Sequence, residues 1–238
     1  MVVLIVPCFN EATRLDIAAF KDAVHSGLRF IFVDDGSRDN TYEILQSHFG
    51  SNPFCKVLKA PKNLGKGEAT RFGMNELQKL SWWQDVKWAG LWDADLSTPL
   101  EEVKNFLSFK DAYPDCLAVW GSRVYRLGAR IKRSPLRHYL GRGFATLVHH
   151  ALNVEAYDTQ CGAKLFSRDA VVSAFKDRFI SRWIFDIEIL LRLDQSNIVE
   201  YPLRRWEDVP GSKIRIGREI FRVLREIWII RKKYIQKS

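Results

Sequence analysis

The chain has 238 residues, of which 47% are hydrophobic, and a formal net charge of +9. This length and composition exclude a disordered chain and fit one large domain. No apolar stretch is long enough to cross a bilayer, no basic leader precedes Pro7, and the four cysteines lack the spacing of a zinc site or a disulfide framework. We therefore expect a cytoplasmic protein with reduced thiols.

The positive charge is concentrated in two segments. Residues 116–154 contain seven basic side chains and no acid, and residues 215–238 contain eight basic and two acidic side chains. Nucleic-acid-binding proteins carry similar clusters, but no nucleic-acid-binding motif accompanies these two, so we expect no nucleic acid partner. A solvated surface loop is the alternative for the first segment. An anion is favoured there, because seven bases without an acid repel one another.

Five short apolar runs alternate with segments of helical character. They cover residues 2–6, 30–33, 54–58, 88–92 and 117–120. This alternation predicts βαβ units and a mostly parallel sheet. A helix is expected over Thr41–Phe49, and another after Asp95, with Thr98 as N-cap and Pro99 at its first position.

The second half of the chain is less regular. We expect a basic loop over residues 122–133, helices over residues 136–152 and 183–193, and strands near residues 163–166 and 198–204. A final helix begins near Ile216. From residue 220 onward its apolar residues recur at helical spacing beside many bases, which is typical of a helix in a membrane interface. The alternative is a helix that packs on its own domain.

Acidic side chains follow several of the predicted strands. Asp93 and Asp95 end the run at residues 88–92, Glu11 follows the first run, and Asp34 and Asp35 follow the second. The carboxyl ends of parallel strands meet at one sheet edge, where α/β folds bind ligands. Carboxylates spaced i, i+2 can share a hard cation, so the cluster favours a metal-bound nucleotide. The alternative is a set of solvated turns.

A glycine-rich segment at residues 62–73 leads into a predicted helix. Lys66 and Arg71 lie in its first turns, where the backbone amides and the helix N-terminus suit a phosphate. The segment is neither a Walker A loop nor a complete G-x-G-x-x-G fingerprint, and a simple helix-capping turn is the alternative.

Taken together, these motifs resemble family 2 glycosyltransferases of the GT-A fold. The resemblance rests on Pro7-Cys-Phe-Asn-Glu11, Val33-Asp-Asp-Gly-Ser37, Asn63-Leu-Gly-Lys-Gly67, Asp93-Ala-Asp95 and Gly121-Ser-Arg123. Later segments, 158–166, 182–188, 206–213 and 230–234, are similar to the branch that transfers glucose to dolichyl phosphate. The chain departs from eukaryotic members in lacking an N-terminal membrane helix, and from mannose synthases in having Ser97, Thr98 and a single Pro99 after the acidic motif.

The resemblance implies an α/β fold of GT-A type, Rossmann-like, with a mostly parallel central sheet flanked by helices and a C-terminal amphipathic helix. It implies one domain over residues 1–238. Residues 1–115 form a nucleotide-sugar-binding half, residues 116–214 an acceptor-binding half, and residues 215–238 the basic helix.

Site residues follow from the same resemblance. Donor binding is expected at Pro7, Phe9, Glu11, Asp34, Asp35, Lys66, Arg71 and Asp93. Mg²⁺ or Mn²⁺ is expected on Asp93 and Asp95. The acceptor phosphate is expected at Arg123, Arg133, Arg137, Gln160 and Lys213. Catalytic roles are expected for Asp158, Asp93 and Asp95.

The predicted function is inverting transfer of a hexose, with glucose as the expected sugar, from a UDP-sugar to dolichyl or another polyprenyl phosphate. The enzyme is expected at the inner face of a membrane, on an anionic surface. The alternatives are GDP-mannose as donor, a sugar hydroxyl as acceptor, or a non-catalytic binder of nucleotide sugars or polyanions. A hydroxyl acceptor would require a general base such as Asp158, Asp186 or Glu188. We expect Asp186 and Glu188 to be structural and Asp158 to act through charge and positioning.

Overall fold

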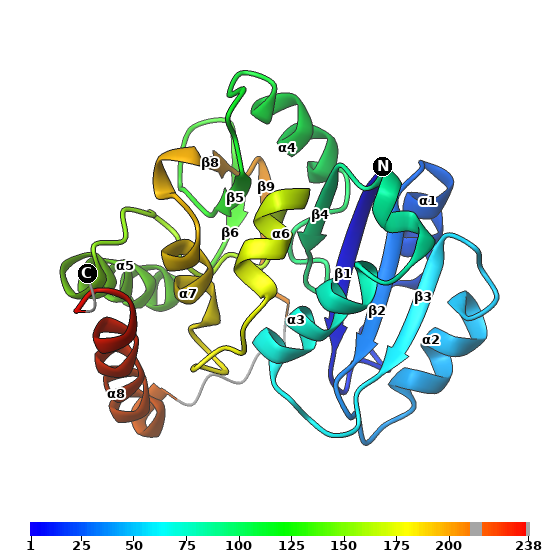
Figure 1. The fold of residues 1–238 in the computed structure, drawn as a ribbon, viewed down its shortest axis with the longest axis horizontal. Helices are drawn as coiled ribbons and strands as arrows, with labels where there is room; N and C mark the ends of the chain where they lie inside the picture. The colour runs from blue at the N-terminus through cyan, green and yellow to red at the C-terminus, as the bar shows by residue number, and fades with distance from the viewer. Residues whose placement is uncertain (210–215, 237–238) are drawn as a thin grey trace.

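A seven-stranded sheet runs through the computed structural model, which describes residues 1–209 and 216–236 (Figure 1). Its strands are β1 (Val2–Cys8), β2 (Arg29–Asp34), β3 (Cys55–Lys59), β4 (Trp88–Leu91), β5 (Ala118–Ser122), β7 (Lys164–Ser167) and β8 (Ile198–Pro202). Their order is β3-β2-β1-β4-β7-β5-β8. Only β7 is antiparallel to its neighbours, β4 and β5, within this sheet. The predicted mostly parallel sheet is confirmed.

Helices cover both faces of this sheet. They are α1 (Ile17–His25), α2 (Thr41–Phe49), α3 (Lys66–Leu77), α4 (Glu102–Lys110), α5 (Pro135–Leu152), α6 (Arg168–Phe175), α7 (Phe185–Arg192) and α8 (Ile216–Tyr234), with short 3₁₀ turns at Ser81–Asp85 and Gln195–Asn197. Successive side chains of β1 point to opposite faces of the sheet, as in any pleated strand. Val3 and Ile5 join a core cluster with α3, α5, α6, α7 and α8, whereas Leu4 and Val6 join one with α1, α2 and α4.

The basic segment after β5 contains a strand that the sequence did not predict. Strand β6 (Arg130–Lys132) pairs in parallel with β9 (Arg205–Glu207) in a separate two-stranded sheet. Ile131 and Trp206 face each other in this pair, and both are buried, whereas their neighbours in the two strands are exposed. The prediction of a loop throughout residues 122–133 is therefore wrong at its end, because pairing with β9, which lies far away in the sequence, makes residues 130–132 a strand.

The helix after Asp95 begins three residues later than predicted. Thr98 is not its N-cap; the carbonyl of Thr98 accepts the indole N–H of the buried Trp92 at 2.8 Å. The chain then makes a turn in which the amide of Glu102 donates to the carbonyl of Pro99, and α4 starts at Glu102. The tertiary contact of Trp92 thus prevails over the local capping signal.

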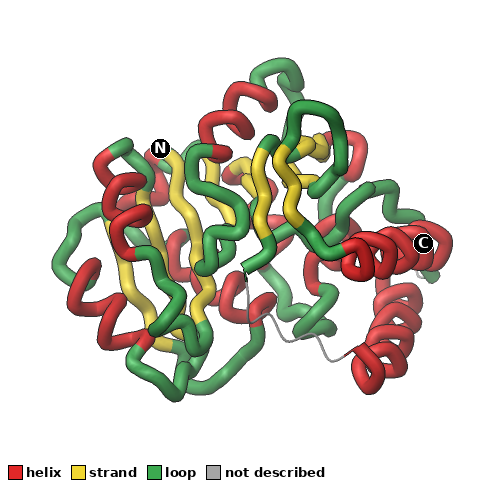
Figure 2. The backbone as a smooth tube through the Cα atoms, turned by 180° about the vertical axis from the view of Figure 1, so that it is seen from behind, coloured by secondary structure: helices red, strands yellow, loops and turns green. Residues whose placement is uncertain are grey.

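Helix α8 begins at Ile216, as predicted, and packs beside α5 at the end of the molecule farthest from β3 (Figures 1 and 2). Its Ile227 and Ile230 are buried in the core cluster of α5 and α7. Within residues 1–209 and 216–236, no helix has the length and apolar character needed to span a bilayer.

Candidate functional site

A cavity of about 680 Å³ opens where the strands of the large sheet deliver their carboxyl ends. Its lining includes residues that end or follow β1, β2, β4 and β5, as expected for an open α/β sheet. Most of the predicted site residues lie in this lining: Pro7, Phe9, Glu11, Asp35, Lys66, Asp93, Asp95, Arg123, Arg133 and Gln160. Residues expected at the donor, the metal and the acceptor therefore share one cavity.

The loops after β1 and β2 hold each other in place. The amide of Asp35 donates to the carbonyl of Cys8 at 2.8 Å, and the amide of Glu11 donates to the Thr41 hydroxyl at 2.8 Å. Asn10 adopts a left-handed conformation with φ of 56°, which asparagine tolerates better than most residues. This turn brings the side chains of Phe9 and Glu11 to the cavity.

Asp34 and Asp35 have different surroundings. Asp34 is fully buried at the end of β2 and accepts the amide of Ser37, and it does not line the cavity. Asp35 does line it, and its two oxygens accept the amides of Leu64 and Gly65 at 2.6 and 2.9 Å. Burial raises the pKa of Asp35, and these two amides partly offset that effect. Asp35 is therefore held rigidly at the wall of the cavity.

Asp93 and Asp95 follow β4 and face the cavity with Lys66 from the start of α3. Lys66 Nζ lies 2.5 Å from Asp93 Oδ1. Burial opposes ionisation of Asp93, but the charge and hydrogen bond of Lys66 outweigh it and hold the pKa of Asp93 below its ordinary value. Asp95 Oδ1 accepts the amide of Ser97 at 3.0 Å. Both carboxylates are thus fixed before any ligand binds.

The oxygen donors around Asp93 and Asp95 fit a hard divalent cation. Glu11 Oε2 is buried without a hydrogen-bond partner in the structure, and burial raises the pKa of Glu11, with Asp95 and Asp93 adding to the rise. The ion pair of Arg14 with Glu11 offsets part of this rise, and a cation at Asp93 and Asp95 would relieve the remaining repulsion among the three carboxylates. The described residues contain no complete cluster of three or more metal-ligating side chains. Mg²⁺ commonly uses one or two carboxylates and takes its other ligands from substrate phosphates and water.

Arg123 and Asp158 form a buried pair beside the cavity. Arg123 donates through Nε and Nη2 to the two Asp158 oxygens at 2.6 and 2.7 Å, and through its amide at 3.1 Å. Burial opposes the charge of Asp158, but Arg123 more than offsets it and holds the pKa of Asp158 well below its usual range. Asp158 does not line the large cavity, whereas Arg123 does. Asp158 therefore orients Arg123, and its expected catalytic role stays a prediction.

Arg133 and Gln160 complete this side of the cavity. The backbone N–H of Gln160 donates to Asp158 Oδ1 at 3.2 Å, which holds Gln160 in place. Burial lowers the pKa of the Arg133 guanidinium, and the neighbouring charge of Arg123 lowers it further. Two arginines that repel each other at one cavity wall favour an anion between them, and guanidinium groups match phosphate oxygens well.

Four predicted site residues do not line this cavity: Asp34 and Asp158, described above, and Arg71 and Arg137. Arg71 forms a two-pronged pair with Glu68 on α3 and does not line the cavity. Arg137 donates to both oxygens of Asp208 at 2.5 and 2.7 Å, which ties α5 to the segment after β9. Lys213 lies outside the described residues.

The cavity also contains residues to which the sequence analysis gave no ligand role: Asn63, Arg182, Trp183, Asp186 and Arg222. Asp186 pairs with the fully buried Lys164 at 2.9 Å, and burial raises its pKa while Lys164 and Lys66 lower it. For Arg182, Trp183 and Asp186 the available signal was the segment 182–188, in which the sequence analysis considered only Asp186 and Glu188 and expected both to be structural.

Comparison with known proteins identifies the family. Residues 3–174 match Glycosyl transferase family 2. The chain belongs to this family. It is 33% identical over 234 residues to dolichyl-phosphate beta-glucosyltransferase ALG5C of Trichomonas vaginalis, covering 90% of this chain and 66% of that protein. It is 31% identical over 258 residues to dolichyl-phosphate beta-glucosyltransferase of Saccharomyces cerevisiae, covering 98% and 74%. The chain thus spans slightly less than two thirds of the first of these relatives.

Solved structures of other glycosyltransferases share the fold. Mannosyl-3-phosphoglycerate synthase from Rubrobacter xylanophilus has a TM-score of 0.69 and 15% identity, and covers 100% of this chain and 75% of its own. Glucosyl-3-phosphoglycerate synthase from Mycobacterium tuberculosis, crystallised with Mn²⁺, UDP-glucose and phosphoglyceric acid, has a TM-score of 0.64 and 18% identity, covering 97% and 79%. These similarities confirm the predicted GT-A fold of this family 2 glycosyltransferase.

Proposed function

We propose that this glycosyltransferase moves glucose, with inversion, from UDP-glucose to the phosphate of dolichol or another polyprenol. The observation that carries the proposal is one cavity lined at once by carboxylates suited to a metal-bound nucleotide and by arginines suited to a phosphate. The names of the relatives, dolichyl-phosphate beta-glucosyltransferases, support this acceptor. The UDP-glucose complex of a structural neighbour supports the donor.

The donor binds on the side of the cavity formed by the loops after β1 and β2. Phe9 and Asp35 line the nucleoside end there, and Lys66 supplies a positive charge toward the diphosphate. Asp93 and Asp95 hold Mg²⁺ or Mn²⁺. When bound, this cation stabilises the negative charge of the departing diphosphate. Because Lys66 already pairs with Asp93, its ammonium lies beside the predicted metal site.

The acceptor phosphate binds at Arg123 and Arg133, and Gln160 lines the same wall. A phosphate monoester has a second pKa of about 6, so it is largely dianionic near neutral pH and attacks without losing a proton. No general base is then required. Asp158 contributes by holding Arg123 in a fixed orientation. Attack in a single displacement inverts the configuration at the anomeric carbon.

A lipid acceptor requires contact with a membrane, and α8 supplies it. Trp228 and Leu224 are 62% and 44% exposed, while Ile227 and Ile230 are buried in the protein core. Arg225, Arg231 and Lys232 are exposed on the same helix. Helix α8 therefore packs on its own domain through Ile227 and Ile230, and its exposed side chains face the anionic headgroups of the membrane. Each base near such a surface adds roughly 1 kcal/mol. The protein works in this way at the cytoplasmic face of a membrane.

The test is incubation of the protein with radiolabelled UDP-glucose, Mn²⁺ and a polyprenyl phosphate, followed by extraction into organic solvent. Label in the organic phase, dependent on both the acceptor and the cation, is the expected result. NMR of the product should show a β-glucosyl linkage. GDP-mannose serves as the matched donor control and should give far less product.

A second candidate is transfer to a hydroxyl acceptor, favoured by the position of Asp186 in the cavity lining. Burial raises the pKa of this carboxylate, which favours proton uptake, and the ion pair with the buried Lys164 offsets this only in part. Water-soluble labelled product formed with 3-phosphoglycerate, and none with polyprenyl phosphate, would replace the first proposal. Donor binding without any product would indicate a non-catalytic binder.

A further inference from the structure

The segment between α6 and α7 forms part of the cavity wall at the nucleotide side. Its Arg182 and Trp183 line the cavity. The guanidinium of Arg182 donates to the backbone carbonyl of Asn63 at 3.2 Å and also to the side-chain oxygen of Asn63. A Cβ at Gly65 would lie 2.7 Å from Arg182 Nε, so the two residues are in close contact. Arg182 therefore packs on the loop whose amides fix Asp35.

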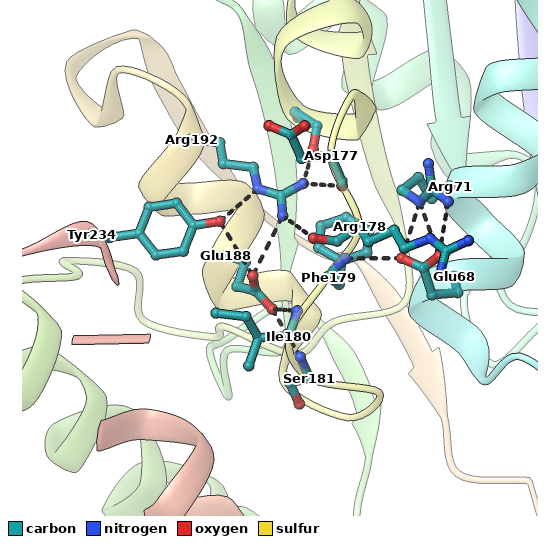
Figure 3. A network of polar contacts seen from close by, with 11 residues as sticks. Glu68, Arg71, Asp177, Arg178, Phe179, Ile180, Ser181, Glu188, Arg192 and Tyr234 are labelled. Atoms are coloured by element: carbon teal, nitrogen blue, oxygen red, sulfur yellow. Dashed lines mark hydrogen bonds and ion pairs between the residues drawn. The ribbon is translucent and has the colours of Figure 1, made fainter. Parts of the chain in front are cut away.

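This wall segment has little regular structure of its own, and carboxylates from neighbouring helices hold its backbone (Figure 3). Glu68 of α3 accepts the amide of Phe179 at 2.8 Å. One oxygen of Glu188 on α7 accepts the amides of Ile180 and Ser181 at 2.8 and 3.0 Å. These contacts fix the segment directly before Arg182.

Glu188 is fully buried and is itself oriented by α8. Its second oxygen accepts the hydroxyl of Tyr234 at 3.3 Å and contacts Arg192 at 3.4 Å, while Arg192 Nε donates to the same hydroxyl at 3.0 Å (Figure 3). Arg192 also donates to the carbonyls of Asp177 and Arg178 at the start of the segment. Tyr234 thus reaches the cavity wall through Glu188 and Arg192, without lining the cavity.

A second contact from α8 reaches the same segment. The hydroxyl of Ser181 donates to Glu226 at 2.6 Å, and the same hydroxyl oxygen accepts the amides of Trp183 and Ile184 at 3.0 and 2.8 Å. Glu226 is paired on α8 with Arg222, whose side chain lines the cavity. Residues 180–184 are therefore linked to α8, whereas Phe179 is held by Glu68 of α3.

We infer that α8 is a positioning element of the nucleotide-binding wall: Tyr234 and Glu226, acting through Glu188 and Ser181, hold Arg182 and Trp183 in place for the donor. This inference rests on the proposed function for the identity of the donor. It assigns α8 a role in donor binding in addition to membrane contact. It also gives Glu188 a structural task, because its carboxylate is fully buried by these contacts and does not line the cavity.

Tyr234→Phe tests the inference, because it removes one hydroxyl and keeps the ring. Losing this hydrogen bond is expected to raise the KM for UDP-glucose and the Kd for UDP about three- to tenfold, with the acceptor KM and kcat at saturating donor unchanged. Tyr113→Phe is the control, because Tyr113 lies on the surface after α4 and packs on Phe109. Glu226→Gln should change the same constants in the same direction as Tyr234→Phe.

Hydrogen exchange gives a readout that does not depend on the reaction. In Tyr234→Phe the amides of residues 179–184 are expected to exchange at least about threefold faster, with no change in β1 to β4. Unchanged exchange in residues 179–184 would overturn the inference even if the enzyme turns over. Equal losses of donor and acceptor affinity would also overturn it, since they indicate general loosening. Faster local exchange in a protein that does not bind UDP would refute the proposed donor and keep the positioning role.

Discussion

Replacing Asp158 by asparagine removes the charge that holds Arg123 at the cavity wall. The two side chains are only 10% and 13% exposed, and Arg123 engages both carboxylate oxygens. Asparagine retains one acceptor and turns an amide N–H₂ toward a guanidinium donor. Breaking a buried pair on one side costs about 3–5 kcal/mol, and the slight exposure of this pair favours the lower end, about 3 kcal/mol. For a chain of this size, about 3 kcal/mol corresponds to a decrease in Tm of roughly 6–12 °C.

Urea denaturation of the unsubstituted protein and of Asp158→Asn, from pH 7 to pH 3, checks the size of the loss in unfolding free energy and its cause. The folded-state pKa of Asp158 lies below its unfolded value of about 3.9, so its charge stabilises the fold above that pH and loses this effect as the pH falls below it. The difference in unfolding free energy should therefore be largest at pH 7 and shrink below about pH 4. Asp111→Asn, in the exposed pair with Lys110, is the control and should cost less than about 1 kcal/mol. A difference under about 1 kcal/mol for Asp158→Asn, or one that grows as the pH falls, would refute the reasoning.

Three further predictions concern the site and the membrane. Asp95→Asn should abolish turnover with little change in Tm, because Asp95 carries one of the predicted metal carboxylates; near-normal, metal-dependent turnover would contradict this. Arg133→Lys and Arg137→Lys should raise the acceptor KM and leave UDP affinity unchanged, with the larger effect at Arg133, since Arg133 lines the cavity and Arg137 is engaged by Asp208. Loss of UDP affinity at constant acceptor KM would reverse that assignment. Trp228→Ser should reduce salt-sensitive sedimentation with anionic vesicles, and equal sedimentation of the variant and the unsubstituted protein would show that this face is not the contact.

The sheet and its acidic edge could be predicted because both depend on local signals. Buried strands require continuous apolar runs, and the polar residue that ends each run must lie at the sheet edge. The choice between Asp34 and Asp35 could not be made in this way. It depends on where β2 stops pairing, and Asp35 turns to the cavity because its amide bonds to Cys8 of the neighbouring strand.

The part of the cavity wall that contains Arg182 and Asp186 could not be predicted from the sequence, because tertiary packing places these residues there. Asp186 lies on α7, and the sequence of α7 alone does not reveal which of its faces meets the cavity. Phe185 of α7 packs directly on Gly67 of α3. A Cβ added at Gly67 would lie 2.6 Å from the ring of Phe185, so α7 lies close against the start of α3. A contact between residues more than 100 positions apart leaves no periodic signal in either segment, so only the three-dimensional structure places Asp186 and Arg182 beside Lys66.

Because β7 lies between β4 and β5, the large sheet cannot be completed in the order in which its strands are synthesised. In the large sheet, β5 has only β7 and β8 as neighbours, and both are made later than β5; β4 likewise lacks one neighbour until β7 emerges. A nascent chain that has reached β5 can pair β1 to β4 but leaves an unpaired edge on β4. Such edges invite pairing with other chains. The edge of β4 that β7 later covers therefore stays unpaired in a growing chain until residue 167 has been made.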